Sequence, residues 1–403
     1  MAGFANIIFG SFNIYFPVQM VSIDDPELKY KIGITLIPGI GSVIAKKMIE
    51  FTGAPGEVFK AGKNLLEKIP GIGKRLAANI SNQQILDKAQ KEIEFISKYE
   101  VKTYYCYDED YPERLKQCPD SPVLLFMKGK SDLNHPKVLS IVGTRNASSY
   151  GLEFCRELVR DLARKGHNPL IVSGLAYGID ICAHKAALGN DLNTIAALAH
   201  GLSTIYPPLH RNVARDITGN GALVTDFIST CLPEKGNFIK RNRIIAGLAD
   251  ATLVIESRTS GGALLTADLA NSYNRDVFAL PGRINDKRSQ GCNNLIKTHK
   301  AALIEDSKDI EYILGWTPVI DYQGKTDSDH YAETGEDEKL ILMLLADNAE
   351  LSIDRIIGET GLGVSNTSCL LLDLEFKGYI TCLPGKRYML ANRLLQHRDE
   401  KTS

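Results

Sequence analysis

The apolar positions between residues 105 and 316 form short runs rich in β-branched side chains, and longer stretches with helical spacing separate these runs. This alternation is typical of an α/β fold with a mostly parallel sheet. The clearest helix covers residues 152–165, where apolar side chains recur every three or four residues. The predicted strands cover residues 123–127, 138–142, 170–173, 194–199, 223–225, 252–256, 276–279 and 301–304.

A repeat precedes this region, within a predicted helical domain that covers residues 25–104. The sequence Ile-Pro-Gly-Ile-Gly occurs at residues 37–41 and again at residues 69–73. Each copy predicts a helix that ends at the Pro-Gly step and a second helix that begins after the last glycine. The pattern resembles a tandem helix-hairpin-helix (SAM-like) domain, which binds DNA backbones without reading their sequence.

The second helix of each hairpin begins with free backbone N–H groups that can bind a phosphate, and cations one turn later can contact the same backbone. The alternative is a small helical domain whose hairpins serve only packing or protein contact. The candidate backbone contacts are Gly39, Gly41, Lys46, Lys47, Gly71, Gly73, Lys74 and Arg75.

A third module follows a polar, acidic linker over residues 317–335. Helices are predicted at residues 338–346, 353–360 and 365–377, and a hairpin joins strands at 379–383 and 387–390. Three helices and a β-wing predict a winged-helix domain over residues 336–395. The third helix carries Asp373, Glu375 and only Lys377, whereas a helix for the DNA major groove normally carries more cations. This favours a protein-contact or regulatory role over duplex DNA binding.

The charge of the whole chain hides large differences between these modules. Lys and Arg number 47 and Asp and Glu 48, and such a balance would argue against a nucleic-acid binder. Residues 31–100, however, hold 11 cations and 7 anions, and residues 305–350 hold 3 cations and 13 anions. Taken module by module, the charge permits nucleic-acid binding.

Cysteine spacing and hydropathy exclude several other classes of protein. The 8 cysteines show no Cys-x-x-Cys or Cys/His spacing, which predicts reduced thiols and no metal site. No apolar run approaches the roughly 18–20 residues that span a bilayer. The first 28 residues contain no Lys or Arg, unlike a secretory signal. A cytoplasmic protein without membrane association is therefore expected.

Glycine-rich and basic segments follow several predicted strands, where α/β proteins bind their ligands. Residues 143–148 place Arg145 inside a turn suited to a phosphate, and residues 173–180 turn through glycines into a helix. Residues 240–243 bring three cations to the head of another helix. Each glycine-rich turn has a purely structural alternative, and Glu256 is interpreted as a structural or nucleotide-contacting carboxylate. The aromatic residues beside these loops, which either stack on bases or pack, are Tyr150, Tyr177, Tyr206 and Phe238.

These segments, with Tyr206-Pro207, residues 241–248 and Pro281-Gly282, occur in an order that resembles the DNA-processing protein A (DprA, or Smf) family. The resemblance implies an extended Rossmann-like domain over residues 105–316 that binds single-stranded DNA and loads the RecA recombinase during natural transformation or recombination. It also implies a homodimer. The implied groove is lined by Arg145, Ser148, Gly174, Lys240, Arg241 and Arg243, and the neighbouring Gly143, Thr144, Asn242, Ser260 and Gly261 complete the candidate DNA-binding set.

Two other functions remain open. A nucleotide phosphoribohydrolase has a related fold, but its Pro-Gly-Gly-x-Gly-Thr signature is absent and Ser260-Gly261-Gly262 is the nearest approach. A duplex-DNA regulator would use the winged helix. The leading hypothesis is a protein that is not an enzyme, with no cofactor and no metal.

Overall fold

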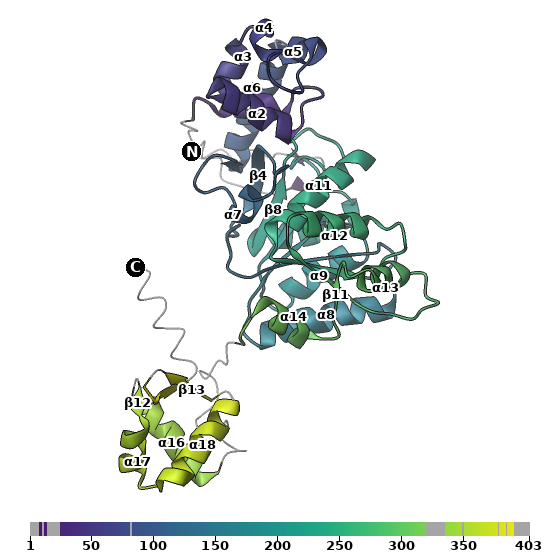
Figure 1. The fold of residues 1–403 in the computed structure, drawn as a ribbon. Coiled ribbons are helices and arrows are strands. Elements are labelled where there is room, and N and C mark those ends of the chain that lie inside the picture. The colour runs from purple at the N-terminus through teal and green to yellow at the C-terminus, as the bar shows by residue number, and fades with distance from the viewer. Residues whose placement is uncertain are drawn as a thin grey trace, which may run out of the picture. The chain divides into compact units, whose positions relative to one another are not determined.

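The computed structural model describes residues 8–9, 12–13, 25–80, 83–318, 335–348, 350–377, 379–383 and 385–390. The chain divides into two compact units, Met1–Thr317 and Pro318–Ser403 (Figure 1). Most of the predicted linker, together with residues 391–395 of the predicted winged helix, lies outside the described residues. Among the helices that are described, none is both long and apolar enough to cross a membrane.

The N-terminal part of the first unit is helical, as the repeat predicts. Its two hairpins share one geometry, because Gly39 and Gly71 take the left-handed φ values of 84° and 98° that favour glycine. The hairpins also pack reciprocally: a Cβ on Gly39 would lie 2.9 Å from Leu76, and one on Gly71 would lie 3.9 Å from Ile44. The helices are α1 (Leu28–Thr35), α2 (Ser42–Thr52), α3 (Pro55–Lys60), α4 (Lys63–Leu66), α5 (Lys74–Ile80) and α6 (Gln83–Tyr99), and a short hairpin of β1 (Ile8–Phe9) and β2 (Phe12–Asn13) precedes them.

A nine-stranded sheet in the order β11-β10-β9-β5-β6-β7-β8-β4-β3 forms the centre of the unit. The pairs from β11 to β8 are parallel, which confirms the predicted α/β class, whereas β4 pairs antiparallel with both β8 and β3. The strands are β3 (Lys102–Tyr105), β4 (Leu124–Gly129), β5 (Val138–Gly143), β6 (Leu170–Ser173), β7 (Thr194–Ala197), β8 (Gly221–Thr225), β9 (Ala251–Ile255), β10 (Asp276–Ala279) and β11 (Ala302–Leu303).

Strand β3 corrects the sequence-based boundary at residues 104 and 105. Its last residue, Tyr105, pairs with Leu124 of β4, so the predicted boundary cuts an edge strand of the sheet. Short runs with half-exposed polar positions give a weak strand signal, and β3 exists because β4 offers it a free edge. The helical domain is therefore joined directly to the sheet.

Alternate residues of each central strand face opposite layers of helices. In β5, Val138 and Val142 belong to a cluster of buried hydrophobic side chains that includes residues of α11 (Lys235–Leu248) and α12 (Gly262–Ser272). Leu139 and Ile141 belong to the cluster that holds α8 (Ser149–Arg164) and α9 (Ile179–Leu188). The remaining helices are α7 (Glu113–Lys116), a 3-10 turn (Pro208–His210), α10 (Arg211–Gly219), α13 (Gln290–Lys297) and α14 (Ser307–Leu314).

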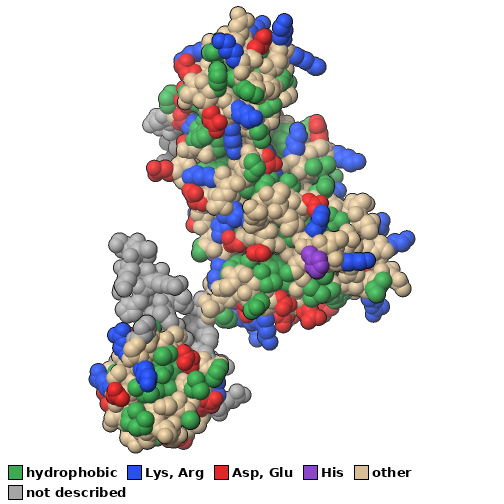
Figure 2. Space-filling model, in the orientation of Figure 1, with side chains coloured by type: hydrophobic (Ala, Val, Ile, Leu, Met, Phe, Trp, Pro, Cys, Tyr) green, Lys and Arg blue, Asp and Glu red, His purple; other side chains and the backbone are tan. Residues whose placement is uncertain are grey.

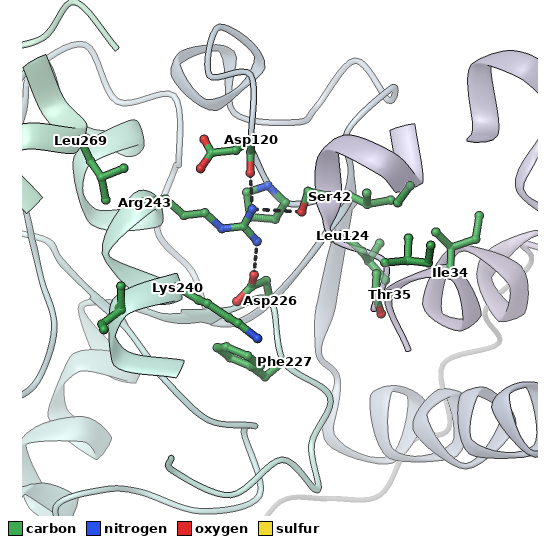
Figure 3. Close-up of a pocket in the computed structure, with 16 residues that line it drawn as sticks. Ile34, Thr35, Ser42, Asp120, Leu124, Asp226, Phe227, Lys240, Arg243 and Leu269 are labelled. Atoms are coloured by element: carbon green, nitrogen blue, oxygen red, sulfur yellow. Dashed lines mark hydrogen bonds and ion pairs between the residues drawn. The ribbon is translucent and has the colours of Figure 1, made fainter. Parts of the chain in front are cut away.

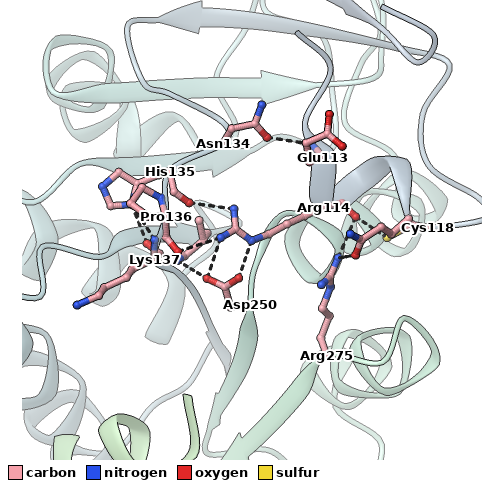
Figure 4. A network of polar contacts seen from close by, with 11 residues as sticks. Glu113, Arg114, Cys118, Asn134, His135, Pro136, Lys137, Asp250 and Arg275 are labelled. Atoms are coloured by element: carbon pink, nitrogen blue, oxygen red, sulfur yellow. Dashed lines mark hydrogen bonds and ion pairs between the residues drawn. The ribbon is translucent and has the colours of Figure 1, made fainter. Parts of the chain in front are cut away.

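A polar network fixes the amino ends of β5 and β9, opposite the loops that carry the candidate site (Figure 4). Arg114 donates from Nε to Asp250 Oδ1 at 2.6 Å and from Nη1 to the His135 carbonyl at 2.9 Å. Asp250 Oδ2 also accepts the Val138 backbone N–H at 2.7 Å. Arg114 also donates from Nη2 to Asp250 Oδ2 at 3.0 Å, so the two side chains form a bidentate pair. This pair fixes the position of α7 against the sheet.

The second unit is a winged helix, as predicted. Its sheet has the antiparallel order β12-β14-β13. Ile341, Ile356 and Leu374 from three different helices meet in its buried core. Its elements are α16 (Glu336–Asp347), β12 (Leu351–Ser352), α17 (Ile353–Thr360), α18 (Val364–Phe376), β13 (Ile380–Leu383) and β14 (Arg387–Leu390).

Candidate nucleic-acid interface

A pocket of about 660 Å³ lies beyond the carboxyl ends of β5 and β9, against the first turns of α11. We call it the strand-edge pocket. Parallel strands end at the same edge of a sheet, and this brings loops that are distant in sequence together. Four cations, Arg145, Lys235, Arg241 and Arg258, line it against the single carboxylate Asp180. The predicted residues that line it are Gly143, Thr144, Arg145, Arg241, Asn242, Ser260 and Gly261.

A row of flat side chains crosses the mouth of the strand-edge pocket. The exposed Arg145 guanidinium lies 5.3 Å from the centre of the Phe238 ring, within the range of a cation–π contact. The Phe238 ring lies 5.9 Å from Tyr206, which is 42% exposed. Tyr177 and Tyr150 are exposed as well, but Tyr177 contacts His210 and Tyr150 donates a hydrogen bond to the Pro281 carbonyl. Arg145, Phe238 and Tyr206 therefore form the row.

Arg241, predicted from the sequence to line the DNA groove, lies almost wholly buried at the base of the pocket. It is only 4% exposed, and its Nη1 donates to the carbonyls of Gly174, at 2.7 Å, and Ala197. Burial lowers its pKa to about 10, so it remains charged at neutral pH. Burial also raises the pKa of Asp180, and the nearby Arg241 charge opposes that shift. Arg241 thus ties the ends of β6 and β7 together beneath the pocket.

Gly174 and Ser148 shape the loops and do not line the strand-edge pocket. A Cβ on Gly174 would lie 2.5 Å from the Arg241 guanidinium, so only glycine leaves room for that side chain. Ser148 caps helix α8, and both its backbone N–H and its hydroxyl donate to the buried Glu256 carboxylate. Gly151 is close to the same carboxylate, since its Cβ would lie 2.8 Å away. Glu256 therefore holds the 143–151 loop in place.

Lys240 and Arg243 line a second cavity, of about 450 Å³, which we call the interdomain pocket (Figure 3). Arg243 forms an ion pair with Asp226 and donates to Ser42 Oγ of α2 at 3.0 Å and to the Asp120 carbonyl. It therefore connects the first hairpin to the sheet domain. Helical geometry explains why residues of one helix line two different pockets. Lys240 and Arg243 share one face of α11, while Phe238 and Arg241 share another.

The two hairpins of the helical domain are not equally accessible. Lys46 donates to Ser121 Oγ at 2.5 Å, so this predicted contact to the DNA backbone faces the sheet domain instead. Its partial burial there lowers its pKa. Gly41 lines the interdomain pocket, and Gly39 and Lys47 are exposed. In the second copy all four predicted residues, Gly71, Gly73, Lys74 and Arg75, are exposed. Figure 2 shows Lys and Arg side chains projecting along the right-hand edge of this unit, from the helical domain to the region of α13.

Lys235 and Arg258 also line the strand-edge pocket, although neither is among the predicted site residues. Lys235 is the first residue of α11, and Arg258 is the third residue after the end of β9. The signal for Lys235 and Arg258 in the sequence is their position within three residues of a strand end or a helix start. Asp226 is not among the predicted site residues, because its ion pair with Arg243 cannot be read from sequence spacing.

Comparison with known proteins decides the family. The model for "DNA recombination-mediator protein A" matches residues 102–314, which is more than half of the chain. The chain belongs to this family. A second model, for the DprA winged helix domain, matches residues 326–386. The resemblance seen in the sequence is thereby confirmed, together with the Rossmann-like fold, the winged helix and a role in DNA binding and processing.

Relatives of the family cover most of the chain. Protein Smf of Synechocystis sp. is 30% identical over 397 residues, which are 90% of this chain and 98% of the relative. Protein Smf of Escherichia coli is 36% identical over 284 residues, which are 69% of this chain and 74% of the relative. The X-ray structure of DNA processing protein A from Streptococcus pneumoniae superposes with a TM-score of 0.62 at 30% identity, and covers 70% of this chain and 97% of that one.

Proposed function

We propose that this protein binds single-stranded DNA across the strand-edge pocket, protects it and loads the RecA recombinase onto it during natural transformation or recombination, without catalysing a reaction. The observation that carries the proposal is the row of Arg145, Phe238 and Tyr206 beside three further lining cations, Lys235, Arg241 and Arg258. Cations attract the phosphates, and exposed rings stack on bases. Paired bases of a duplex present no free face to such rings, so the row favours a single strand.

The enzyme alternative has less support from the carboxylates near the pocket. General acid–base chemistry requires a carboxylate that can reach a substrate and exchange a proton. Asp180 is buried beside Arg241, and Glu256 accepts two hydrogen bonds from Ser148. Both carboxylates therefore serve the loops, and Asp180 is the one carboxylate in the described lining of the strand-edge pocket.

The duplex-regulator alternative depends on the winged helix, whose third helix has one cation at its end. Lys377 follows α18 and forms ion pairs with Glu338 at 2.7 Å and Asp373 at 3.3 Å. A cation held by two carboxylates is a poor partner for a base edge or a phosphate. We therefore assign the winged helix to contact with a protein partner.

A homodimer is part of the proposal, and one edge of the sheet suits it. Strand β11 is the terminal strand, and its Leu303 is exposed. On α14, which follows it, Ile313 is exposed and Tyr312 is 88% exposed. A second copy that covered these side chains would remove apolar surface from water. Mass measurement of the full chain with Tyr312→Lys beside the unchanged protein tests this assignment.

Fluorescence anisotropy with a labelled single strand and its duplex, at several salt concentrations, tests the proposed function. We expect tighter binding of the single strand and a logarithmic salt slope that Arg145→Ala reduces by about one, since one phosphate contact is lost. Arg215→Ala is the matched control, because this exposed arginine of α10 lies outside both pockets. Equal affinity for duplex, or equal effects of the two substitutions, would refute the proposal.

RecA loading needs a separate readout. ATP hydrolysis by RecA on single strands covered by a single-strand-binding protein should start sooner when this protein is added. Arg145→Ala should lose the acceleration, because a protein that cannot bind the strand cannot load RecA onto it. Unchanged lag times with the intact protein would refute the loading step and leave strand binding in place.

A further inference from the structure

The interdomain pocket differs in character from the strand-edge pocket. Apolar side chains from the helical domain and from β4, among them Ile34, Ala45 and Leu124, line it together with the Phe227 ring (Figure 3). Its volume of about 450 Å³ lies in the range of pockets that hold small organic molecules. The pocket therefore has room for a flat ring against apolar walls.

The charges of this pocket balance. Two carboxylates, Asp120 and Asp226, face two cations, Lys240 and Arg243. The strand-edge pocket, by contrast, has four cations against one carboxylate. A phosphate would be attracted to the strand-edge pocket by its excess of cations, and it would gain little attraction from the balanced charges of the interdomain pocket. The interdomain pocket thus suits a neutral group with hydrogen-bonding atoms.

Asp226 supplies the specific acceptor. Its side chain is 10% exposed, and one oxygen accepts from the Arg243 guanidinium. The other oxygen, Oδ1, is buried and has no hydrogen-bond partner among the described residues. A buried carboxylate oxygen without a donor is unfavourable, so a ligand that brings an N–H group into the pocket would be stabilised there. Lys240, on the same pocket, offers a donor to an adjacent carbonyl oxygen.

The two pockets lie on opposite faces of the same turns of α11. Phe238 lines the strand-edge pocket, Lys240 lines the interdomain pocket, and Ile239 between them lines both. A strand that is bound in the first pocket would reach the second by crossing the exposed Ile239. Its phosphates would stay with the basic loops while one base enters between the domains.

We propose that the interdomain pocket binds one nucleobase of the bound single strand and prefers guanine. This inference rests on the proposed strand binding at the strand-edge pocket. Guanine carries two adjacent N–H donors for Asp226 Oδ1 and a carbonyl oxygen for the Lys240 ammonium group, and its ring faces Phe227. Thymine offers a single N–H donor, and adenine and cytosine place a ring acceptor beside their amino group. The pocket therefore reads one base of the strand.

Anisotropy titrations of the full chain with oligothymidylate, and with the same oligonucleotide carrying one central guanine, test the inference. We expect the guanine to raise the affinity about tenfold, the magnitude of one good base contact. Inosine, which lacks the 2-amino group, should give an intermediate affinity. This series uses the unchanged protein, so it remains decisive even if a variant fails to fold.

Asp226→Asn should bring the guanine-to-thymine ratio close to one. The amide oxygen can still accept from Arg243, while the amide N–H₂ now faces the N–H donors of guanine. Asp268→Asn is the matched control, because Asp268 is an ion-paired carboxylate of α12 outside both pockets, and the ratio should persist there. Equal affinity of the unchanged protein for both oligonucleotides, or a preference that survives Asp226→Asn, would overturn the inference. Failure to bind either oligonucleotide would instead overturn the proposed function.

Discussion

Replacement of the buried arginine beneath the strand-edge pocket is expected to destabilise the protein, and not merely to weaken its binding of DNA. Arg241→Met removes a charge that donates to the Gly174 and Ala197 carbonyls and faces Asp180. Its loss leaves two buried carbonyls without their donor and the buried Asp180 without a nearby opposite charge, which together cost about 3–5 kcal/mol. At about 2–4 °C per kcal/mol for a domain of this size, Tm should fall by roughly 6–20 °C.

The loss should depend on pH in a defined direction. Burial already raises the pKa of Asp180, and without Arg241 it should rise further. A carboxyl whose folded-state pKa is raised binds a proton in the folded state, so its contribution to stability is lost as pH rises through that pKa. The Arg241→Met penalty should thus be smaller at pH 5 than at pH 8.

Thermal unfolding followed by circular dichroism measures the change in Tm, and urea unfolding at both pH values measures the pH dependence of the penalty. The double variant Arg241→Met with Asp180→Leu should recover part of the loss, because neither charge then remains unpaired. A Tm within a degree of the unchanged protein for Arg241→Met, or the same penalty at both pH values, would refute the reasoning.

Three further substitutions test the site and its supports. Gly174→Ala should cost about 1–3 kcal/mol, since its Cβ would lie 2.5 Å from a buried guanidinium, whereas Gly219→Ala, with open space around it, should cost less than about 0.5 kcal/mol in urea unfolding. Ser148→Ala should cost about 1–2 kcal/mol, because α8 loses its cap and Glu256 loses one donor; an unchanged midpoint would contradict this. The buried Glu92 of α6 accepts hydrogen bonds from the backbone N–H and the hydroxyl of Ser229. Burial raises its pKa, so stability should fall as pH rises from about 4.5 through that raised value, and Glu92→Gln should remove this dependence.

The modules could be predicted because their signals are local. The repeated Ile-Pro-Gly-Ile-Gly motif determines both hairpins through the left-handed Gly39 and Gly71, and the winged helix follows from three consecutive helices and a hairpin turn at Gly385. Strand β3 is absent from the predicted strands, because it forms by pairing with β4 about twenty residues away and its own composition does not indicate a strand.

The basic cluster on α11 shows what proximity in sequence conceals. Lys240, Arg241 and Arg243 were expected in one groove, yet successive helical residues point about 100° apart. Lys240 therefore lines one pocket, Arg241 passes beneath the other, and Arg243 joins the two domains. The partners of these side chains, Gly174 and Asp226, come from strand ends that only the folded sheet brings near. Burial of a cation is a tertiary property, and it could not be read from the cluster itself.

The contact of the first hairpin with the sheet domain limits the number of DNA backbones that the helical domain can bind. The first hairpin contributes Ser42 and Lys46 to contacts with the sheet domain, while Lys74, which corresponds to Ser42 in the second hairpin, and its neighbour Arg75 remain exposed. A duplex presents two antiparallel backbones, and two symmetry-related turns would be needed to follow both. With one turn occupied internally, we expect this domain to follow a single phosphodiester chain.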